Sequence, residues 1–361
     1  MYVLTTIFDS QRMDMEAAKS YMKKVIVTGG AGFLGSHICQ LFLTRGWKVD
    51  AFDNMSKFEL MRTGYNVDKA RDYNKNLLTK LGVQVQVADV RNFETLLECA
   101  MHCDYIIHTA AQPAMTIALE DPKFDFDNNA LGTLNVLEVG RKLNIPVALC
   151  STIHVSGNGS NNVFEHLLEH KSLCTENSPI LTGRITPLHV SKYIDELYGR
   201  AYVESYNSKV AVFRLTGFYG PRQLGGEDHG WVANFAIRTV LDLPIKIFGT
   251  DKQVRDILYV TDVAQAFLKW YENGQPSGLY NICGGQECIT SLGDCLKMLS
   301  EITGKKQDIT LEPARQGDLW YFVGSYEKAA GSFGWRPNIM PRDGIQSLVE
   351  WVEENRSLFS K

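Results

Sequence analysis

Long apolar runs are missing from this sequence of 361 residues. No stretch approaches the ~20 consecutive apolar residues that a helix needs to cross a bilayer, so we expect no membrane segment. The first 21 residues also lack a basic segment followed by an apolar one, and they are interpreted as an N-terminal extension and not as a signal peptide. The net charge is only −4, which does not favour a nucleic-acid-binding protein.

Paired cysteines of the CxxC type are also absent, and this argues against a zinc site. The eight cysteines are scattered, and we expect buried free thiols in the reducing environment of the cytoplasm. His166 and His170 are spaced four residues apart beside Glu165 and Glu169, as in a helical metal site. Because no third ligand is evident, a solvated helical turn is the favoured interpretation and no metal is predicted.

Short apolar runs that alternate with helical patterns are present instead. Strands are predicted at 23–30, 48–54, 83–90, 105–111, 145–152, 209–216 and 245–249, and helices near 36–46, 91–102, 128–143, 187–206, 231–241, 291–303 and 342–355. This alternation is typical of parallel βαβ units, so the predicted fold is α/β, a doubly wound parallel sheet of the Rossmann type. We predict a nucleotide-binding domain of residues 22–216, to which 256–270 returns. Residues 217–255 and 271–361 would form a smaller C-terminal substrate-binding part.

The segment "TGGAGFLG", residues 28–35, follows a predicted strand and opens a predicted helix. Gly29, Gly32 and Gly35 are spaced three residues apart, which lets the backbone pass close to a pyrophosphate at the N-terminus of the helix. Asp53 ends the second strand, where a carboxylate accepts hydrogen bonds from a ribose diol and repels a 2′-phosphate. This pattern favours NAD over NADP, and the alternative is a glycine loop that only packs a helix.

Together with motifs further along the chain, these residues resemble the extended short-chain dehydrogenase/reductase family, and within it the NAD-dependent sugar-nucleotide epimerases and dehydratases. The similar segments span about 22 to 355 and include "HTAAQ" (108–112), "NNALGTLNVLE" (128–138), "SK" (191–192), "FYGPRQ" (218–223) and "VRDILYVTDVAQAF" (254–267). The segments "AAQPAMTIALEDPKFDF" (110–126), "DHGWV" (228–232) and "KQVRD" (252–256) are most similar to the CDP-tyvelose/CDP-paratose 2-epimerases.

The resemblance implies a set of ligand-binding residues. Those that would bind NAD are Gly29, Gly32, Phe33 and Leu34 at the pyrophosphate, Asp53 and Asn54 at the adenosine ribose, Asp89 and Val90 at the adenine, Ala110, Ala111, Gln112 and Asn129 at the nicotinamide half, and Lys192 at the nicotinamide ribose. Those that would bind the substrate are Met115, Thr116, Arg222, Arg255 and Arg315. For the arginines the chemistry agrees, because a planar guanidinium binds phosphate oxygens bidentately. Taken singly, each arginine is equally consistent with a solvated charge on the surface and with a group that binds the diphosphate.

The base that the family uses for proton transfer is missing. There a tyrosine, four residues before a lysine, acts with a threonine or serine. Thr152 and Lys192 occupy two of these positions, but Leu188 stands where the tyrosine is expected. General acid–base catalysis contributes roughly 10²–10⁴ in rate. His154 is a candidate replacement, because its ordinary pKa of ~6.5 would let it transfer protons near neutrality. The alternative is a histidine bonded to backbone in the pocket wall. His189 is predicted to point elsewhere, about 100° around the helix.

We therefore predict a cytoplasmic NAD-dependent epimerase that acts on a nucleotide-activated deoxyhexose, with a CDP-linked sugar as the first candidate. It would act through a transient keto-sugar in surface-polysaccharide synthesis. One alternative is a nucleotide-sugar oxidoreductase or lyase that uses a non-tyrosine base such as His154, and another is a redox-silent protein that binds NAD and a nucleotide sugar. The resemblance also implies a homodimer formed through the helices near 128–143 and 187–206. Neither nucleic acid nor a membrane is an expected partner.

Overall fold

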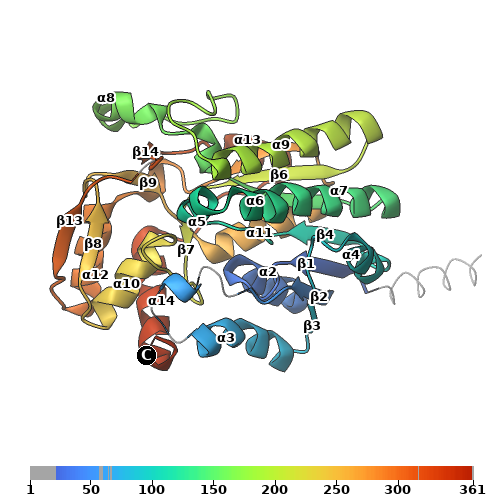
Figure 1. Cartoon of the computed structure of the whole chain (residues 1–361), viewed down its shortest axis with the longest axis horizontal. Coiled ribbons are helices and arrows are strands. Elements are labelled where there is room, and N and C mark those ends of the chain that lie inside the picture. The colour runs from blue at the N-terminus through green and yellow to red at the C-terminus, as the bar shows by residue number, and fades with distance from the viewer. Residues whose placement is uncertain (1–21, 57–59, 64, 66, 316, 360–361) are drawn as a thin grey trace, which may run out of the picture.

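The computed structural model describes residues 22–56, 60–63, 65, 67–315 and 317–359, so the predicted extension at 1–21 lies outside the described residues. A parallel sheet of seven strands lies at its centre (Figure 1), in the order β11-β6-β5-β4-β1-β2-β3. The strands are β1 (Lys24–Thr28), β2 (Lys48–Asp53), β3 (Gln84–Val87), β4 (Tyr105–His108), β5 (Val147–Thr152), β6 (Val210–Leu215) and β11 (Gly278–Ile282). This is the doubly wound topology that the sequence predicts.

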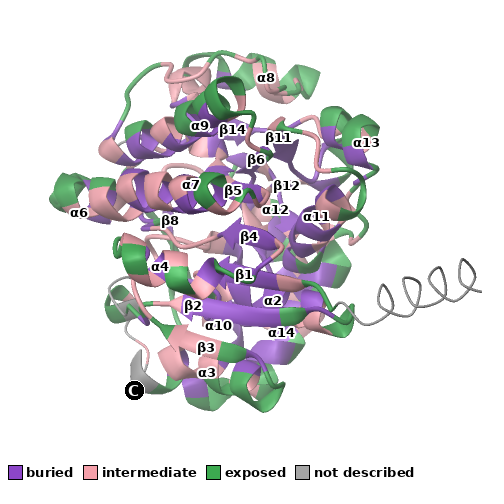
Figure 2. Cartoon of the chain, turned by 90° about the vertical axis from the view of Figure 1, so that its right-hand side faces the viewer, coloured by how far each residue is buried: buried purple, intermediate pink, exposed green. Residues whose placement is uncertain are grey.

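Helices cover both faces of the sheet, and most central strands are buried on both sides (Figure 2). This explains why the strands read as continuous apolar runs. Along β1, for example, Val25 packs into one layer and Ile26 into the other. The helices of the first layer are α2 (Phe33–Thr44), α3 (Val67–Lys80) and α11 (Val260–Glu272), and those of the second are α4 (Phe93–Ala100), α7 (Gly132–Leu143) and α9 (Pro187–Tyr206).

Helix α9 positions the residues that matter most for the site, and its local sequence sets where it begins. Pro187 occupies the first turn, where a missing N–H has no helical partner to lose. Just before it, the backbone N–H of Thr186 donates to Nδ1 of His189 at 2.7 Å and completes a cap. With this start, Leu188 and Lys192 lie one turn apart on the same face of the helix.

A second group of helices and short strands lies to one side of the central sheet and encloses a separate apolar core (Figure 1). Its helices are α10 (Trp231–Val240), α12 (Leu292–Thr303) and α14 (Pro341–Glu354). Its strands pair as β8 (Ile245–Phe248) with β13 (Ile309–Glu312), β9 (Val254–Asp256) with β12 (Ile289–Ser291) and β14 (Tyr321–Phe322), and β7 (Phe218–Tyr219) with β10 (Leu258–Tyr259).

Short helices and turns connect these groups. They are η1 (Leu60–Arg62), α5 (Met115–Glu120), α6 (Pro122–Phe126), the π-helical turn η2 (Asp127–Leu131), η3 (Ile153–Ser156), η4 (Gly159–Val163), α8 (Phe164–His170), η5 (Gln286–Cys288), α13 (Glu327–Phe333) and η6 (Arg356–Leu358). The helix predicted at 128–143 therefore begins as a π turn and continues as α7. In the described part of the chain, no helix combines the length and the apolar character needed to span a bilayer.

Strand β11 lies in a different part of the structure from the one that the predicted division gives it. That division places 271–361 in the smaller part, yet Gly278–Ile282 pairs in parallel with β6 and forms an edge of the central sheet. Helix α11, immediately before it, packs on α2 in the first layer. The chain thus leaves the central sheet after β6, builds β7 to β10, and then returns to the sheet through α11. The remaining boundaries of the two parts stay a prediction.

Candidate functional site

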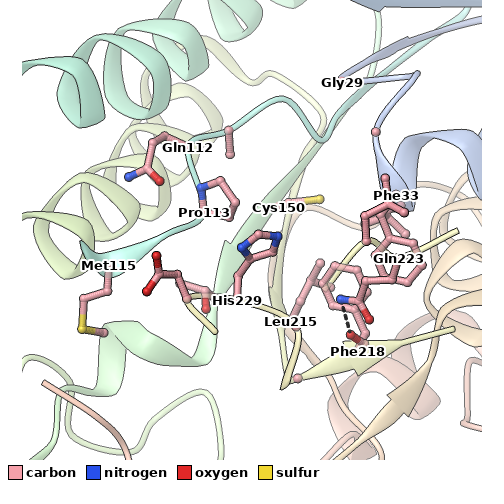
Figure 3. A pocket seen from close by; sticks show the side chains of 18 of the residues that line it. Gly29, Phe33, Gln112, Pro113, Met115, Cys150, Leu215, Phe218, Gln223 and His229 are labelled. Atoms are coloured by element: carbon pink, nitrogen blue, oxygen red, sulfur yellow. Dashed lines mark hydrogen bonds between the residues drawn. The ribbon is translucent and has the colours of Figure 1, made fainter. Parts of the chain in front are cut away.

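One large cavity lies between the carboxyl ends of the central strands and the second group of helices. Its volume is about 780 Å³, and side chains from both groups line it. Figure 3 shows Gly29 and Phe33 at one end, Gln112 and Met115 at the other, and His229 in the middle. In a doubly wound sheet, ligands bind at this edge, where the strand order reverses. Here the order reverses between β1 and β4.

The glycine turn before α2 leaves no room for side chains. Gly29 has a φ of +67°, and a Cβ atom there would lie 2.6 Å from the backbone nitrogen of Ala110. A Cβ atom on Gly35 would lie only 2.1 Å from the carbonyl oxygen of Gly29. The start of α2 lines the cavity, with no side-chain cap at Gly32 and no acidic residue in the first turn. Its N–H groups and positive dipole end therefore offer a site for a pyrophosphate, which Phe33 and Leu34 would flank.

Asp53 ends β2 beside this turn, and backbone N–H groups hold its carboxylate. Its Oδ2 accepts a hydrogen bond from the N–H of Ala31 at 3.0 Å, and its Oδ1 accepts one from Met55 at 2.8 Å. Burial raises the pKa of this carboxyl, while the N–H groups act in the opposite direction. The side chain is thus fixed at the edge of the cavity, where a ribose diol would reach it.

The predicted adenine-side residues are arranged around one carboxylate. Asn54 Nδ2 donates to Asp89 Oδ2 at 3.0 Å, and Arg91 Nη2 donates to the same oxygen at 2.7 Å. The hydrogen bonds from Arg91 lower the pKa of Asp89 to about 2. Asn54 and Val90 line the cavity, and Asp89 is bonded to Asn54 without being among the lining residues. In this geometry Asp89 positions Asn54 and does not face the cavity itself.

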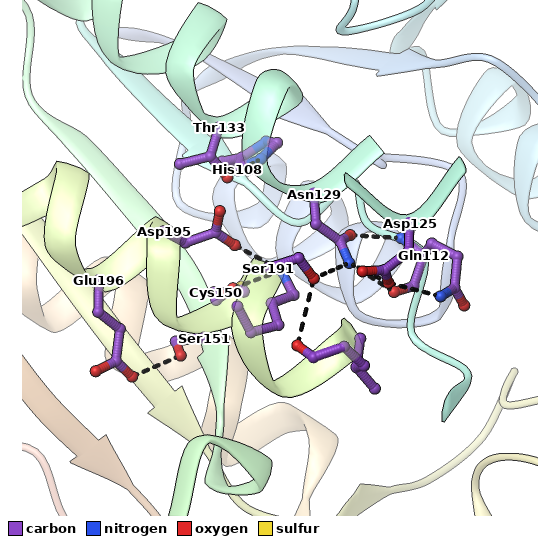
Figure 4. A network of polar contacts seen from close by, with 12 residues as sticks. His108, Gln112, Asp125, Asn129, Thr133, Cys150, Ser151, Ser191, Asp195 and Glu196 are labelled. Atoms are coloured by element: carbon purple, nitrogen blue, oxygen red, sulfur yellow. Dashed lines mark hydrogen bonds and ion pairs between the residues drawn. The ribbon is translucent and has the colours of Figure 1, made fainter. Parts of the chain in front are cut away.

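Gln112 and Asn129 are both predicted at the nicotinamide half, but only the first faces the cavity. Gln112 lines it together with Ala110 and Ala111. Asn129, in the π-helical turn, is fully buried behind this wall (Figure 4). Its Oδ1 accepts from the N–H of Gln112 at 2.8 Å, and its Nδ2 donates to the carbonyl of Gln112 at 3.1 Å. Asn129 therefore holds the segment after β4 in place, and its geometry does not offer the direct cofactor contact that the sequence predicts.

Leu188 and Lys192 lie where the resemblance places them, but the lysine has an unexpected partner. Leu188 is 2% exposed and forms part of the cavity wall. Lys192 Nζ donates to the carbonyl of Cys150 and to Oδ2 of Asp195, each at 3.1 Å. Burial raises the pKa of Asp195 to about 6, and the charge of Lys192 opposes that change. The cation at the cavity thus carries a buried counter-charge that was not predicted from the sequence.

Thr152 and His154 meet at the end of β5. The hydroxyl of Thr152 accepts from the N–H of His154 at 3.3 Å, and both residues line the cavity. Nδ1 of His154 is buried and has no hydrogen-bond partner among the described residues. Burial lowers the pKa of His154 to about 3, helped by the neighbouring His189 and Arg255. With this pKa His154 is neutral near pH 7, and its part in proton transfer stays a prediction. His189 does not line the cavity and packs behind His154 at a ring distance of 6.1 Å.

The enclosed imidazole of His154 is expected to make folding sensitive to acid. The unfolded chain takes up this proton near pH ~6.5, whereas the folded chain takes it up at about 3. Stability is therefore lost as the pH falls between these values, and at about pH 5 the loss from this residue is ~2 kcal/mol. Urea unfolding at about pH 7.5 and at about pH 5 measures the free energy of unfolding under both conditions. Its decrease at the lower pH should be ~2 kcal/mol larger in the parent than in His154→Gln. Exposed His166, changed to glutamine, is the control and should behave as the parent does. Equal losses in the parent and in His154→Gln would contradict this assignment.

Two of the predicted diphosphate arginines differ in where their charge points. Arg222 is buried against α2, where Nη2 donates to Oε1 of Gln40 at 3.0 Å and Nη1 donates to the carbonyl of Ser36 at 3.4 Å. Arg222 thus lines the cavity while its guanidinium is bonded to helix α2. Arg255, on β9, donates from Nη1 to the carbonyl of Val254 at 2.8 Å, and burial lowers its pKa to about 10. An anion bound in the cavity would offset the free-energy cost of burying the charge of Arg255.

Arg315 lines the cavity beside Phe248 and Asp228. Its guanidinium carbon is 3.6 Å from the ring centre of Phe248, and its Nη1 is 3.7 Å from Oδ1 of Asp228. A planar cation against an aromatic ring presents its edge to other ligands. This part of the cavity thus combines an aromatic surface with cations and the carboxylates of Glu227, Asp228 and Asp318.

Further residues complete the substrate side. Met115 and Thr116 line the cavity from α5, as the resemblance implies. Lys246, Asp228 and His229 also line it, and none of these three was predicted as a site residue from the sequence. The sequence "GEDHG" (226–230) indicates only an irregular loop, and the resemblance of "DHGWV" (228–232) did not assign these residues to the site.

Known proteins are similar to this chain over almost its whole length. The sequence pattern of the NAD dependent epimerase/dehydratase family matches residues 25–283. The chain belongs to this family.

CDP-paratose 2-epimerase of Salmonella typhi is 29% identical over 351 residues, which cover 91% of this chain and 99% of that protein. A solved UDP-glucose 4-epimerase of Thermus thermophilus, in complex with NAD, is 31% identical with a TM-score of 0.76. A UDP-glucose 4-epimerase of Thermotoga maritima with UDP-glucose is 29% identical with a TM-score of 0.77. Both alignments cover 92% of this chain and 99% of the other.

The cofactor of this NAD-dependent family fits the residues described above. The turn from Gly29 to Gly35 has space only for backbone, so it can approach a pyrophosphate closely. Asp53 is held at the ribose position by two N–H groups. Ala110 and Ala111 continue the wall toward Lys192, which would donate to the second ribose. NAD is therefore the cofactor, and nucleotide-sugar epimerases and dehydratases are the class of enzyme to which the chain is related.

Proposed function

We propose that this chain binds NAD and a nucleotide sugar in one cavity and epimerises the sugar. A CDP-linked deoxyhexose is the first candidate substrate, because the similar Salmonella typhi protein is a CDP-paratose 2-epimerase. The observation that carries the proposal is the continuity of the cavity. A single space reaches from the glycine turn to Arg255 and Arg315 and passes Thr152, Leu188 and Lys192 on the way.

Each part of the cavity then has a chemical task. Bound NAD supplies the hydride-accepting chemistry of the nicotinamide ring. Arg255 and Arg315 would bind the diphosphate of the substrate, since guanidinium groups bind phosphate oxygens bidentately. Thr152 would donate a hydrogen bond to the sugar oxygen at which negative charge develops. His154, neutral and with an unpartnered Nδ1, is the available group for a proton on the sugar.

A redox-silent protein that binds the same two ligands is the second candidate, and three observations favour it. Leu188 can neither accept nor donate a proton, and Lys192 is paired with the buried carboxylate of Asp195. A low pKa weakens His154 as a base, because a good general base has a pKa near the working pH. An oxidoreductase or lyase step that uses His154 stays an alternative within the enzyme class.

The candidates separate when purified protein is mixed with CDP-, dTDP-, UDP- and GDP-sugars. We expect product NMR to show an inverted sugar, with only transient absorbance from reduced nicotinamide. Tight binding of a nucleotide sugar without any turnover would instead support the redox-silent protein. His154→Gln should abolish turnover and leave NAD bound, and unchanged turnover would remove His154 from the mechanism. If activity appeared only in Leu188→Tyr, the natural chain would not use this chemistry.

Other predictions about the protein depend on the family alone. For a homodimer, the exposed face of α9 offers the apolar side chains Val190, Leu197 and Tyr198. We propose this face, with α7 beside it, as the contact between two copies, and light scattering of the purified chain would test the mass. The cytoplasmic location and the role in surface-polysaccharide synthesis stay predictions.

A further inference from the structure

Lys192 lines the cavity, and its partner Asp195 lies behind the cavity wall. The two charged atoms are 3.1 Å apart, and the side chains are 7% and 1% exposed. A second hydrogen bond, to the carbonyl of Cys150, fixes the ammonium group against β5. Lys192 is thus bonded on two sides within the protein. Lysine and aspartate three residues apart on one helix are neighbours, so α9 itself supplies the pair.

The other titratable groups that face Lys192 do not replace this counter-charge. His108, on β4, bonds to Thr28 at 2.7 Å and to Thr133 at 3.2 Å, and burial lowers its pKa to about 3, so it is neutral. Cys150, on β5, has a thiol whose pKa burial raises to about 12. Asp125, on α6, accepts hydrogen bonds at Oδ1 from the side-chain amides of Gln112 and Asn129. Asp195 is therefore the carboxylate bonded directly to the ammonium group.

A paired ammonium group acts on its surroundings very differently from a lone one. A lone cation within about 4–6 Å lowers the pKa of a neighbouring acid by roughly 1–3 units. When a carboxylate lies against the cation, their fields largely cancel at distances beyond the length of the pair. Position 188 is one helical turn from Lys192 and faces the same cavity. A proton-transferring group there would receive little help from the lysine.

We propose that Asp195 is a positioning residue that neutralises Lys192 and holds its ammonium group against β5. Lys192 then serves as a hydrogen-bond donor on the cofactor side and does not assist proton transfer at position 188. The inference rests on the proposed function only in placing NAD beside Lys192. The ion pair between Lys192 and Asp195 forms within the protein and does not depend on a ligand. It also implies that restoring a tyrosine with Leu188→Tyr alone does not restore the electrostatics that a phenol needs.

The test measures the pKa of the introduced phenol by NMR of the full chain labelled at tyrosine Cζ, with the parent spectrum identifying the new signal. In Leu188→Tyr we expect a phenol pKa at or above ~10, because the site is buried and its cation is paired. In Leu188→Tyr with Asp195→Asn, the unmasked lysine should lower that pKa by at least about one unit. Equal values in the two variants, or a depressed pKa in Leu188→Tyr alone, would overturn the proposal.

A neighbouring carboxylate provides the matched control. Glu196 is also buried on α9, but it bonds to Arg214 at 2.6 Å and to Ser151 at 2.7 Å. Adding Glu196→Gln to Leu188→Tyr removes a carboxylate from the same helical turn without freeing Lys192, so the phenol pKa should stay within about half a unit of that in Leu188→Tyr. A decrease as large as that from Asp195→Asn would assign the effect to negative charge in general and not to the pair.

Thermal unfolding gives a second readout if a tyrosine variant does not fold. Lys192→Met leaves a buried carboxylate unpaired and should lower the melting temperature strongly, whereas Lys192→Met with Asp195→Asn should recover a large part of that loss. Additive losses would show that the two residues do not act as a pair. The phenol titration is performed with and without NAD. If the parent does not bind NAD, the proposed function fails, while the titration without NAD still decides the role of Asp195.

Discussion

Gly35→Ala is expected to abolish practical NAD binding, with a dissociation constant at least about 100-fold higher than in the parent, or ~2.7 kcal/mol of binding free energy. The added Cβ atom would lie 2.1 Å from the carbonyl oxygen of Gly29, so either the glycine turn or the start of α2 must move. Both elements form the pyrophosphate site, and extra atoms in a tightly packed region cost about 1–3 kcal/mol in stability as well. Isothermal titration with NAD measures the first effect, and thermal unfolding measures the second.

Gly331→Ala is the matched control for this substitution. Gly331 lies in helix α13, and a Cβ atom there would meet nothing within 4 Å. An alanine in a helix is favoured over glycine by about 0.5–1 kcal/mol, so this variant should bind NAD as the parent does and melt slightly higher. If Gly35→Ala kept the parent affinity for NAD, the pyrophosphate would not lie over this turn. The cofactor assignment of the whole cavity would then need to be revised.

Arg255→Met is expected to weaken binding of a nucleotide sugar by roughly 100- to 1000-fold, while NAD binding stays close to that of the parent. Arg255 is a largely buried cation that donates to the carbonyl of Val254, and burial lowers its pKa. A diphosphate would supply an anionic partner, and hydrogen bonds between charged groups contribute about 1.5–3 kcal/mol each. Titration with CDP, UDP and their sugar conjugates, after saturation with NAD, measures the loss.

Lys246→Met provides the comparison for a less buried charge in the same cavity. Lys246 Nζ lies 3.5 Å from Glu227, and its side chain is 46% exposed, so its charge is already screened by water. We expect less than about a five-fold loss of affinity for this variant, since exposed pairs contribute little. A loss in Lys246→Met larger than that in Arg255→Met would place the diphosphate nearer the mouth of the cavity. Equal affinities for parent and Arg255→Met would remove the arginine from substrate binding.

The central sheet could be predicted from the sequence because its strands are buried on both faces and therefore appear as apolar runs. β1, β2, β4, β5 and β6 all lie within predicted strands, and α9 occupies the predicted helix at 187–206. Strand β11 could not be recognised in this way. It contains the apolar "GLYNI", but its assignment depends on pairing with β6, more than sixty residues earlier in the chain. Local sequence gives no signal for such a distant partner.

The cofactor half of the site follows from local sequence more closely than the substrate half does. Gly29, Gly32 and Gly35 sit on one turn whose geometry depends on their neighbours in the chain. The surroundings of His154 depend instead on the tertiary packing of His189 and Arg255, and these change its pKa. Asp195 carried a readable signal, since an acidic residue three positions after a cavity-facing lysine on a helix is a neighbour. That signal identifies the pair, but only the fold shows that the pair is buried.

The return of the chain to β11 has a consequence for any attempt to divide this protein. A fragment that ends after β6 would lack the edge strand and helix α11, so it would expose the open side of β6 and the apolar face of α2. Such uncovered strand edges promote association between copies. The nucleotide-binding half is thus not an autonomous module, and grafting it onto another protein would require the intervening loops and strands to travel with it.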